Sequence, residues 1–300
     1  MGHRRKAVAL LAFLLAATGP FGSPTAAPTA DPLATAAIRP LEVPHELRIE
    51  RTGEGREGLE LAARLSVTGN LITRPVGWTV KRALASDAAG GETIFTQESP
   101  VTDLKLEPGD YLVEASYGAV RVAHSVRVEP GRFVGLTLIL NVGGIRALST
   151  LDTIGMPVGV VARHKVLALS GPLAGREIAA SAGQGELLRV AAGSYRIESR
   201  FLPGNTVSET SVTVKPGVLT SVEIAHLAGV ARIDISAATR DTPWVVRTAD
   251  GRDVSSGQGI RPNLILAPGD YAIEADIAGS RRKASFSVVA GKTTRVVVAE

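Results

Sequence analysis

The chain has 300 residues, of which 45% are hydrophobic and 21% charged, so it can build globular cores and is not a disordered polymer. It contains no cysteine, which excludes disulfide frameworks, thiolate metal sites and cysteine nucleophiles. The formal charge of +4 comes largely from Arg4, Arg5 and Lys6, because 30 basic and 29 acidic residues follow them. No concentrated basic stretch is left to neutralise phosphates, so we expect no nucleic-acid partner.

The N-terminal segment has the pattern of an export signal. Positive residues are followed by an unbroken apolar run over residues 7–17 and then by small residues and proline. This run is too short to cross a bilayer as a helix, which takes about 20 residues. We predict a signal peptide and cleavage region over residues 1–30. The mature protein is then periplasmic or secreted, with no integral membrane segment.

Residues 31–58 predict a flexible tether, with room for one added strand. The segment begins rich in Pro, Ala and Thr, a composition typical of linkers. Residues 53–58 superficially resemble a Gly-rich phosphate loop, but no strand-then-helix context surrounds them. We therefore interpret residues 53–58 as part of the linker.

Two ordered blocks recur three times in the rest of the chain. The first ends in Tyr111, Tyr195 or Tyr271, and the second, about twenty residues later, ends in Val-x-x-Gly at residues 128–131, 214–217 and 288–291. Chance does not produce such an order three times, so we predict tandem repeats. Their expected boundaries are 59–143, 144–229 and 230–300.

Each repeat is expected to contain seven strands and little helix. Alternation of apolar and polar residues after each tyrosine marks half-buried strands, and turn signals recur every 8–12 residues. The predicted fold class is all-β, with three tandem antiparallel seven-stranded β-sandwich repeats. In the first repeat the strands are expected near residues 59–67, 78–84, 92–97, 101–106, 111–117, 120–128 and 133–140.

Together the two blocks resemble the prealbumin-like repeats of the carboxypeptidase regulatory-like family, and also fibronectin type III or immunoglobulin-like sandwiches of bacterial exported proteins. The resemblance covers roughly residues 59–300. It implies structural, adhesive or accessory modules that are not themselves catalytic.

The residues shared by the blocks are interpreted as folding devices. Glycine can supply a positive φ for a sharp turn between sheets, and a tyrosine two residues later can return its hydroxyl to the corner backbone. Trp78 and Trp244 are expected in the core, with Val160 in the matching position of the second repeat. The alternatives are a sugar-stacking face for the tyrosines and a ligand site for the tryptophans. The motif residues are Trp78, Pro108, Gly109, Tyr111, Gly193, Tyr195, Trp244, Pro268, Gly269 and Tyr271.

Candidate chemistry is sparse, and we predict no catalytic, cofactor-binding or metal-binding residues. No histidine pair has metal-ligand spacing, and His124, His164 and His226 are expected as solvated or hydrogen-bonded strand residues. Turns are expected from Asp87 and at Asp250. Residues 281–283 are expected to open a solvated edge strand, with binding of an acidic partner as the alternative.

The sequence therefore favours a non-enzymatic exported structural or interaction protein. It would act as a spacer or scaffold with a protein partner at the cell envelope. The alternative is a carbohydrate- or cell-wall-binding accessory module, whose partner would be a glycan. An enzyme assembled from loops of different repeats is the least supported hypothesis.

Overall fold

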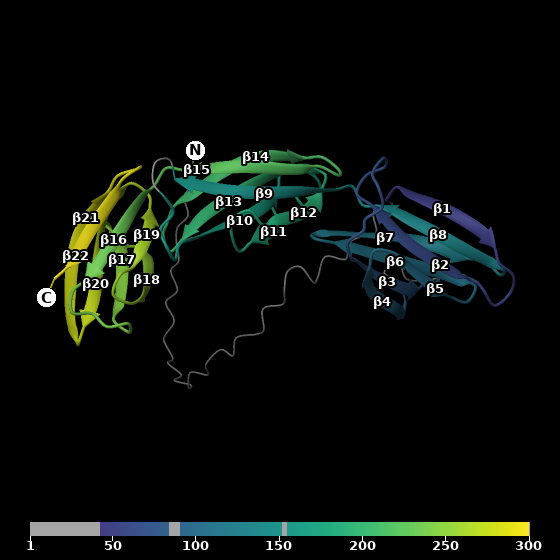
Figure 1. Ribbon diagram of the computed structural model, residues 1–300, viewed down its shortest axis with the longest axis horizontal. Coiled ribbons are helices and arrows are strands. Elements are labelled where there is room, and N and C mark those ends of the chain that lie inside the picture. Colours follow the sequence, from purple (N-terminus) through teal and green to yellow (C-terminus); the bar gives the residue numbers. More distant parts are fainter. Residues whose placement is uncertain (1–42, 84–90, 152–154, 300) are drawn as a thin grey trace, which may run out of the picture. The chain divides into compact units, whose positions relative to one another are not determined.

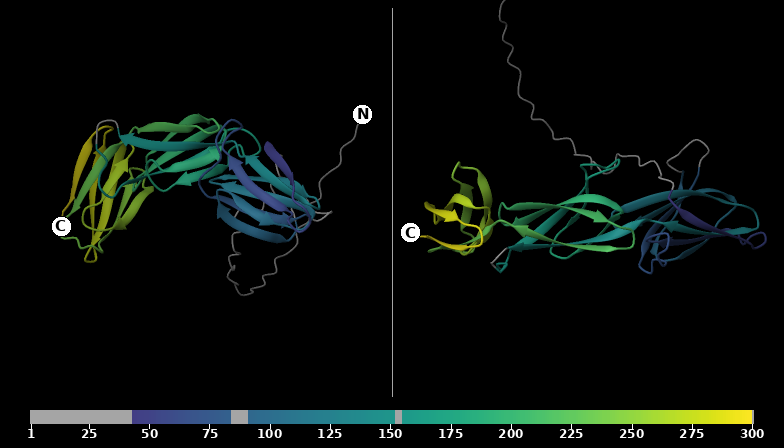
Figure 2. Two further views of the ribbon diagram at one scale, coloured as in Figure 1. Left: turned by 45° about the vertical axis from the view of Figure 1, so that its right-hand side comes forward. Right: turned by 90° about the horizontal axis from the view of Figure 1, so that it is seen from above.

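The computed structural model describes residues 43–83, 91–151 and 155–299, whose strands form six sheets (Figure 1). This part of the chain contains no helix, so none that could cross a membrane, and the predicted all-β architecture is confirmed. The predicted signal peptide over 1–30 and the predicted turn from Asp87 lie outside the described residues. Figure 2 shows the strands from two further directions.

The first repeat has two four-stranded sheets, ordered β1-β8-β2-β5 and β4-β3-β6-β7. The ends of its seven predicted strands differ from the observed ones by at most three residues. β1 is an additional strand. It lies within residues 31–58, for which the sequence predicts a flexible tether with room for one added strand. The strands are β1 (His45–Arg51), β2 (Gly58–Arg64), β3 (Val76–Arg82), β4 (Thr93–Ser99), β5 (Thr102–Lys105), β6 (Gly109–Tyr117), β7 (Val120–Val128) and β8 (Arg132–Ile139).

The second repeat has seven strands in the described ranges, in sheets ordered β11-β10-β13-β14 and β12-β9-β15. The strands are β9 (Val142–Leu151), β10 (Val161–Ala168), β11 (Glu177–Ser181), β12 (Leu187–Ala191), β13 (Gly193–Leu202), β14 (Val207–Val214) and β15 (Leu219–His226).

The third repeat has the same sheet orders, β18-β17-β20-β21 and β19-β16-β22. The strands are β16 (Gly229–Ile235), β17 (Pro243–Thr248), β18 (Asp253–Gln258), β19 (Asn263–Leu266), β20 (Gly269–Ile277), β21 (Ser280–Val288) and β22 (Thr293–Val298).

The predicted antiparallel sandwiches contain one parallel pair of strands in every repeat. The first and last of the seven strands are neighbours and pair in parallel, as β2 with β8, β9 with β15 and β16 with β22. Seven strands that reverse direction at every step leave the first and last pointing the same way, so adjacent positions force a parallel ladder. A repeat therefore starts at one end of its sandwich and finishes at the other.

Each repeat has its own apolar core between its two sheets. In β6, Tyr111, Val113 and Ala115 point inward and are at most 2% exposed, as the alternation predicted. Leu59 and Leu136 of the facing sheet pack against them. Burial of one such large side chain contributes about 1.5–3 kcal/mol, so the core of each repeat is a main source of its stability.

Candidate functional site

The three predicted tyrosines adopt one geometry, repeated in every copy. Each ring is at most 5% exposed. Each hydroxyl donates to the carbonyl four residues earlier, from Tyr111 to Glu107 at 2.7 Å, from Tyr195 to Ala191 at 2.8 Å and from Tyr271 to Ala267 at 2.8 Å. A buried hydroxyl without a partner would destabilise the fold, so this bond closes the corner between the sheets.

The expected positive φ occurs at only one of the three corner glycines. Gly109 and Gly193 do not adopt the left-handed region, and of the three only Gly269 has a positive φ, of 154°. Each glycine is the first residue of its strand, β6, β13 or β20. An added Cβ would lie in ordinary van der Waals contact with the tyrosine two residues on, at 3.6–3.9 Å, so the ring itself does not require glycine. Pro108 and Pro268 precede two of these strands.

The predicted core tryptophans lie where expected, but the second repeat differs. Trp78 is fully buried and its Nε1 donates to the Ser99 carbonyl at 3.0 Å. Trp244 is 8% exposed and its Nε1 has no hydrogen-bond partner. Strand register shows that the equivalent residue of the second repeat is not Val160. Trp78 lies opposite Ala115 and Trp244 opposite Ala275. In the second repeat Ser199 takes the position of these alanines, and the residue opposite it, in the position of the tryptophans, is His164.

His164 belongs to a polar layer that crosses the core of the second repeat. Six hydroxyl and imidazole side chains form this layer, and none is more than 5% exposed. Apolar clusters lie on both sides of the layer along β9, β10 and β13. The six residues of the buried polar layer are Ser149, His164, Ser181, Ser199, Thr206 and His226.

The buried polar layer is one continuous hydrogen-bonded chain. His164 bonds through Nδ1 to Ser181 Oγ at 2.8 Å and through Nε2 to Ser149 Oγ at 2.9 Å. Ser149 Oγ bonds to Ser199 Oγ, which bonds to His226 Nε2 at 2.8 Å. His226 Nδ1 then bonds to Thr206 Oγ1 at 2.6 Å. A neutral imidazole has one donor and one acceptor nitrogen, so two neutral histidines satisfy the whole chain.

The surroundings of both imidazoles favour the neutral form. Burial, and after it the charge of His164, lower the pKa of His226 to about 4. Burial also lowers the pKa of His164, against a smaller opposite effect of the Gly183 backbone. Within the described ranges, the groups facing the imidazoles are hydroxyls, the Gly183 backbone and the Phe201 ring, whose centroid is 4.6 Å from that of His226. None of these groups is a carboxylate that could stabilise a cation.

The Ser–His contacts of the buried polar layer have the spacing of a nucleophile and its base, but not the accessibility. A catalytic serine must reach a substrate, and Ser149 and Ser199 are 3% and 0% exposed. In the part of the chain that the structure describes, no three His, Asp or Glu side chains are grouped to hold a metal ion. The arrangement can therefore hold strands in register, but it offers no route for a substrate.

The remaining described histidines, which the sequence places separately, also meet. The rings of His45 and His124 lie with centroids 3.7 Å apart, between β1 and β7. His45 Nδ1 also contacts the Val43 carbonyl at 3.1 Å. Only two such side chains come together here, which is too few for a metal cage.

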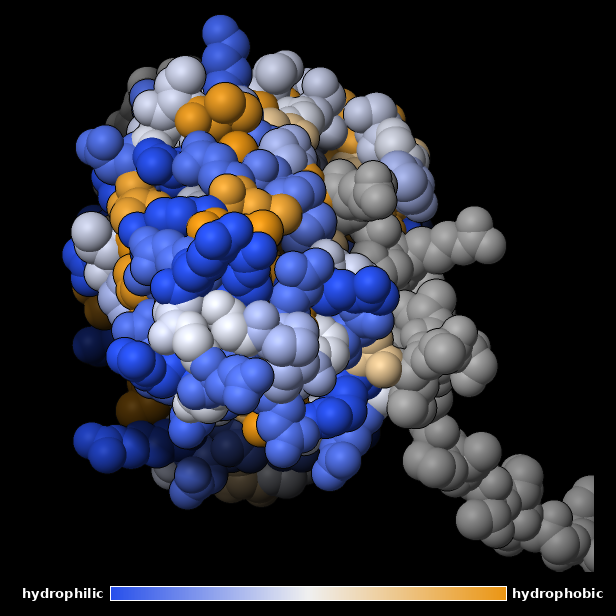
Figure 3. All heavy atoms as spheres, turned by 90° about the vertical axis from the view of Figure 1, so that its right-hand side faces the viewer, coloured by the Kyte–Doolittle hydropathy of each residue, from blue (hydrophilic) through white to orange (hydrophobic). Residues whose placement is uncertain are grey.

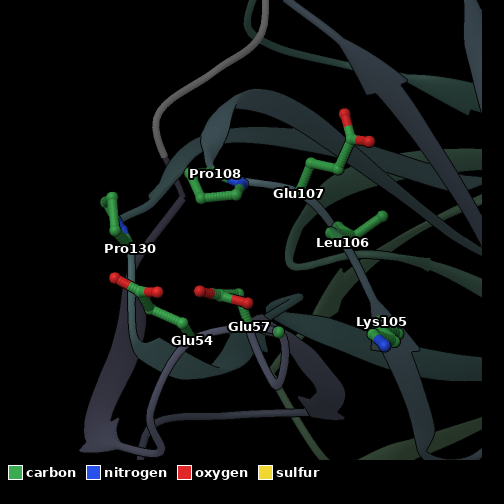
Figure 4. Close-up of a pocket in the computed structure, with 8 residues that line it drawn as sticks. Glu54, Glu57, Lys105, Leu106, Glu107, Pro108 and Pro130 are labelled. Atoms are coloured by element: carbon green, nitrogen blue, oxygen red, sulfur yellow. The ribbon is translucent and has the colours of Figure 1, made fainter.

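The first repeat has an open hollow of about 600 Å³ beside the loop that was interpreted as a linker. Glu54, Glu57 and Lys105 help to line it (Figure 4). Glu57 accepts a hydrogen bond from the Gly131 N–H at 2.9 Å, and this bond lowers the pKa of the carboxyl group. Figure 4 shows Glu107 turned away from Glu57. The hollow is open to solvent, and of Glu54, Glu57 and Lys105, Glu57 is held to the fold by its bond to Gly131.

Residues 232–300 match the profile of the Rhizobiales growth-associated tandem repeat domain. The matched part is less than half of the chain and lies within the third repeat. No curated protein matches the chain.

Several solved structures are similar at low identity. The Bacillus anthracis TIE protein has 15% identity and a TM-score of 0.26, over 81% of this chain and 50% of that one, so the chain spans about half its length. A minor pilin of Streptococcus agalactiae, GBS52, has 12% identity and a TM-score of 0.31, over 56% of this chain and 94% of that one. A streptococcal ancillary pilin has 10% identity and a TM-score of 0.29, over 85% and 99%. At these scores the likenesses carry no conclusion about function.

Proposed function

We propose that this chain is a non-enzymatic exported protein that acts as a spacer or scaffold and binds a protein partner at the cell envelope. The observation that carries the proposal is that the residues shared by the repeats serve the fold. Tyrosine hydroxyls close the corners, and the hydroxyl–imidazole chemistry of the second repeat is enclosed in its core. What the repeats present to a partner is their sheet faces, edges and loops.

The proposed organisation keeps the expected boundaries, with strand β1 (His45–Arg51) preceding the first unit and adding to its sheet. A signal peptide over residues 1–30 directs export, and β-sandwich domains occupy residues 59–143, 144–229 and 230–300. Separate apolar clusters around Trp78, Ile197 and Trp244 support one core in each unit, and a fourth cluster joins Phe201 of the second unit to Ile265 of the third. The match of residues 232–300 to a tandem repeat domain supports the third unit.

The alternative, a carbohydrate- or cell-wall-binding module, has less support. Sugar-binding sites commonly use exposed aromatic rings as stacking platforms. Every Phe, Tyr and Trp side chain in the described ranges is buried or half-buried. Figure 3 shows the face of the first repeat, where apolar residues form small patches between hydrophilic ones.

The scaffold and the glycan-binding module can be distinguished by identifying what the chain binds. Photo-crosslinkers placed at exposed positions such as Val158 and Leu227 should capture one protein of the envelope when the chain is exported in its own bacterium. The purified mature chain should not sediment with isolated peptidoglycan. Sedimentation with peptidoglycan that soluble cell-wall fragments reverse, without a protein cross-link, would overturn the scaffold proposal in favour of the glycan-binding alternative.

A further inference from the structure

Strand β1 of the first repeat has one open side. It pairs with β8 over residues 45–51, and no strand in the described ranges pairs with its other side. All seven of its residues are exposed, including Leu47 at 49% and Ile49 at 59%. An open edge with apolar side chains is a template for pairing with a further strand.

The backbone groups available on this edge can be identified from the hydrogen bonds at both ends of β1. The Pro44 carbonyl accepts from the Ile139 N–H, and the Thr52 N–H donates to the Gly131 carbonyl, both at 2.9 Å. In an antiparallel pair, every second residue directs both polar groups at the partner strand. Even-numbered residues of β1 therefore bond to β8, and the N–H and C=O groups of residues 45, 47, 49 and 51 face outward.

The side chains of β1 are complementary to themselves in the antiparallel direction. Leu47 is in register with the buried Leu136 and so lies on the core-facing side. Glu46, Arg48 and Glu50 then lie on the opposite side, with charges that alternate in sign. A second β1 running the other way meets this pattern with opposite charges.

We propose that β1 pairs antiparallel with β1 of a second copy of this chain, so that two β1-β8-β2-β5 sheets become one continuous sheet. A two-fold axis at Leu47 places Glu46 opposite Arg48 of the second copy, and an axis at Ile49 places Arg48 opposite Glu50. Both axes use the outward-facing backbone groups. An axis at Arg48 would oppose like charges, and the Arg48 backbone already faces β8. Leu47 and Ile49 of both copies come together on the core-facing side and are withdrawn from water.

Edge strand β21 carries a charge pattern that differs from that of β1. β21 is an edge strand, as predicted, and after Ser280 it carries three exposed residues of one sign, Arg281, Arg282 and Lys283. Like charges directly opposite each other disfavour strand pairing. β21 is therefore protected against a second copy by its charges, whereas the alternating charges of β1 favour one. This self-association is independent of the envelope partner proposed above.

Sedimentation velocity of the mature chain over a concentration series tests the proposal. We expect a monomer–dimer equilibrium that weakens with added salt. The R48E variant should lower the association constant about tenfold or more, because two pairs of opposite charge become like pairs. The E46R/E50R variant should also be weakened, and a mixture of the two variants should form heterodimers. R282E on β21 is the matched control and should dimerise like wild type.

Single cysteines identify the register, since the chain has no cysteine of its own. Oxidation should link L47C dimers if the axis lies at Leu47, and I49C dimers if it lies at Ile49. A chain that stays monomeric, or charge variants that neither weaken nor rescue association while keeping wild-type circular dichroism, would overturn the proposal. It would also be overturned if only a chain shortened to begin at Val43 dimerised, because the residues before β1 would then be the occupant of its edge.

Discussion

Lowering the pH from about 7.5 to about 5 should weaken the second repeat through its two buried histidines. Above about pH 6.5 the imidazoles are neutral in both the folded and the unfolded chain. Below it, the unfolded chain binds a proton that folded His226, with its pKa lowered to about 4, does not bind. The free energy of unfolding therefore falls as the pH falls through this window.

The expected loss follows from the width of that window. For one histidine with such a lowered pKa, the free energy of unfolding falls by about 1.4 kcal/mol per pH unit. His226 alone therefore accounts for a loss of about 2 kcal/mol between pH 6.5 and 5. His164 acts in the same direction, because its pKa is lowered as well. Carboxyl groups with a lowered pKa, such as those of Asp110 and Asp250, lose their contribution only at lower pH.

Urea titrations at the two pH values provide the assay. Hydrogen exchange of peptides from β9, β10 and β13, corrected for intrinsic exchange, reports the second repeat. The fluorescence of Trp78 and Trp244 reports the other two repeats as internal controls. In the H226Q variant the glutamine amide can form hydrogen bonds but does not titrate. The stability of the second repeat should therefore depend less on pH in this variant. If the second repeat loses no more stability than its neighbours, the imidazoles titrate freely in the folded chain and the enclosed-layer argument is wrong.

Other predictions concern the corners, the tryptophans and export. Replacing Tyr111 with alanine should destabilise its repeat by about 3–5 kcal/mol in urea unfolding, and with phenylalanine by about 1 kcal/mol. Wild-type stability of the alanine variant would contradict the corner role. Replacing Tyr271 with phenylalanine should cost more than at Tyr111, because its hydroxyl also accepts from Asn205 Nδ2 at 3.1 Å; equal losses would contradict this. Phenylalanine should cost about 1 kcal/mol more at Trp78 than at Trp244, since only the Trp78 indole has a hydrogen-bond partner to lose; hydrogen exchange of peptides from the substituted repeat, followed across a urea series, decides. N-terminal sequencing of the exported protein should begin between about residues 18 and 31, and an intact Met1 would contradict export.

The strands and corners could be predicted from the sequence because their signals are local. Tyr111, Tyr195 and Tyr271 each precede a stretch whose alternation fixes which side chains point inward. The hydroxyl bond of each tyrosine closes within four residues, so no long-range information is needed. The parallel pairing of first and last strands was missed because it depends on the order of strands in the sheet.

The buried polar layer was missed because its partners are far apart in sequence. His164 and Ser199 lie on different strands, and on sequence alone Val160, instead of His164, was matched with the tryptophans. Counting from the tyrosines would have found a signal. Ser199 occupies the position held by Ala115 and Ala275, so the second repeat alone has a polar side chain there. A polar residue at a core position needs a partner, and the strand opposite supplies His164.

The scaffold account is tested most directly by removing the enclosed hydroxyls and following the envelope partner. The S149A/S199A variant lacks the two central serines of the buried polar layer, and alanine already occupies the position of Ser199 in the other two repeats. Photo-crosslinking in the producing bacterium should give the same cross-linked protein, in the same yield, for wild type and for this variant once both are shown to be folded. A folded variant that loses the cross-link would contradict the account, because the buried layer would then take part in function.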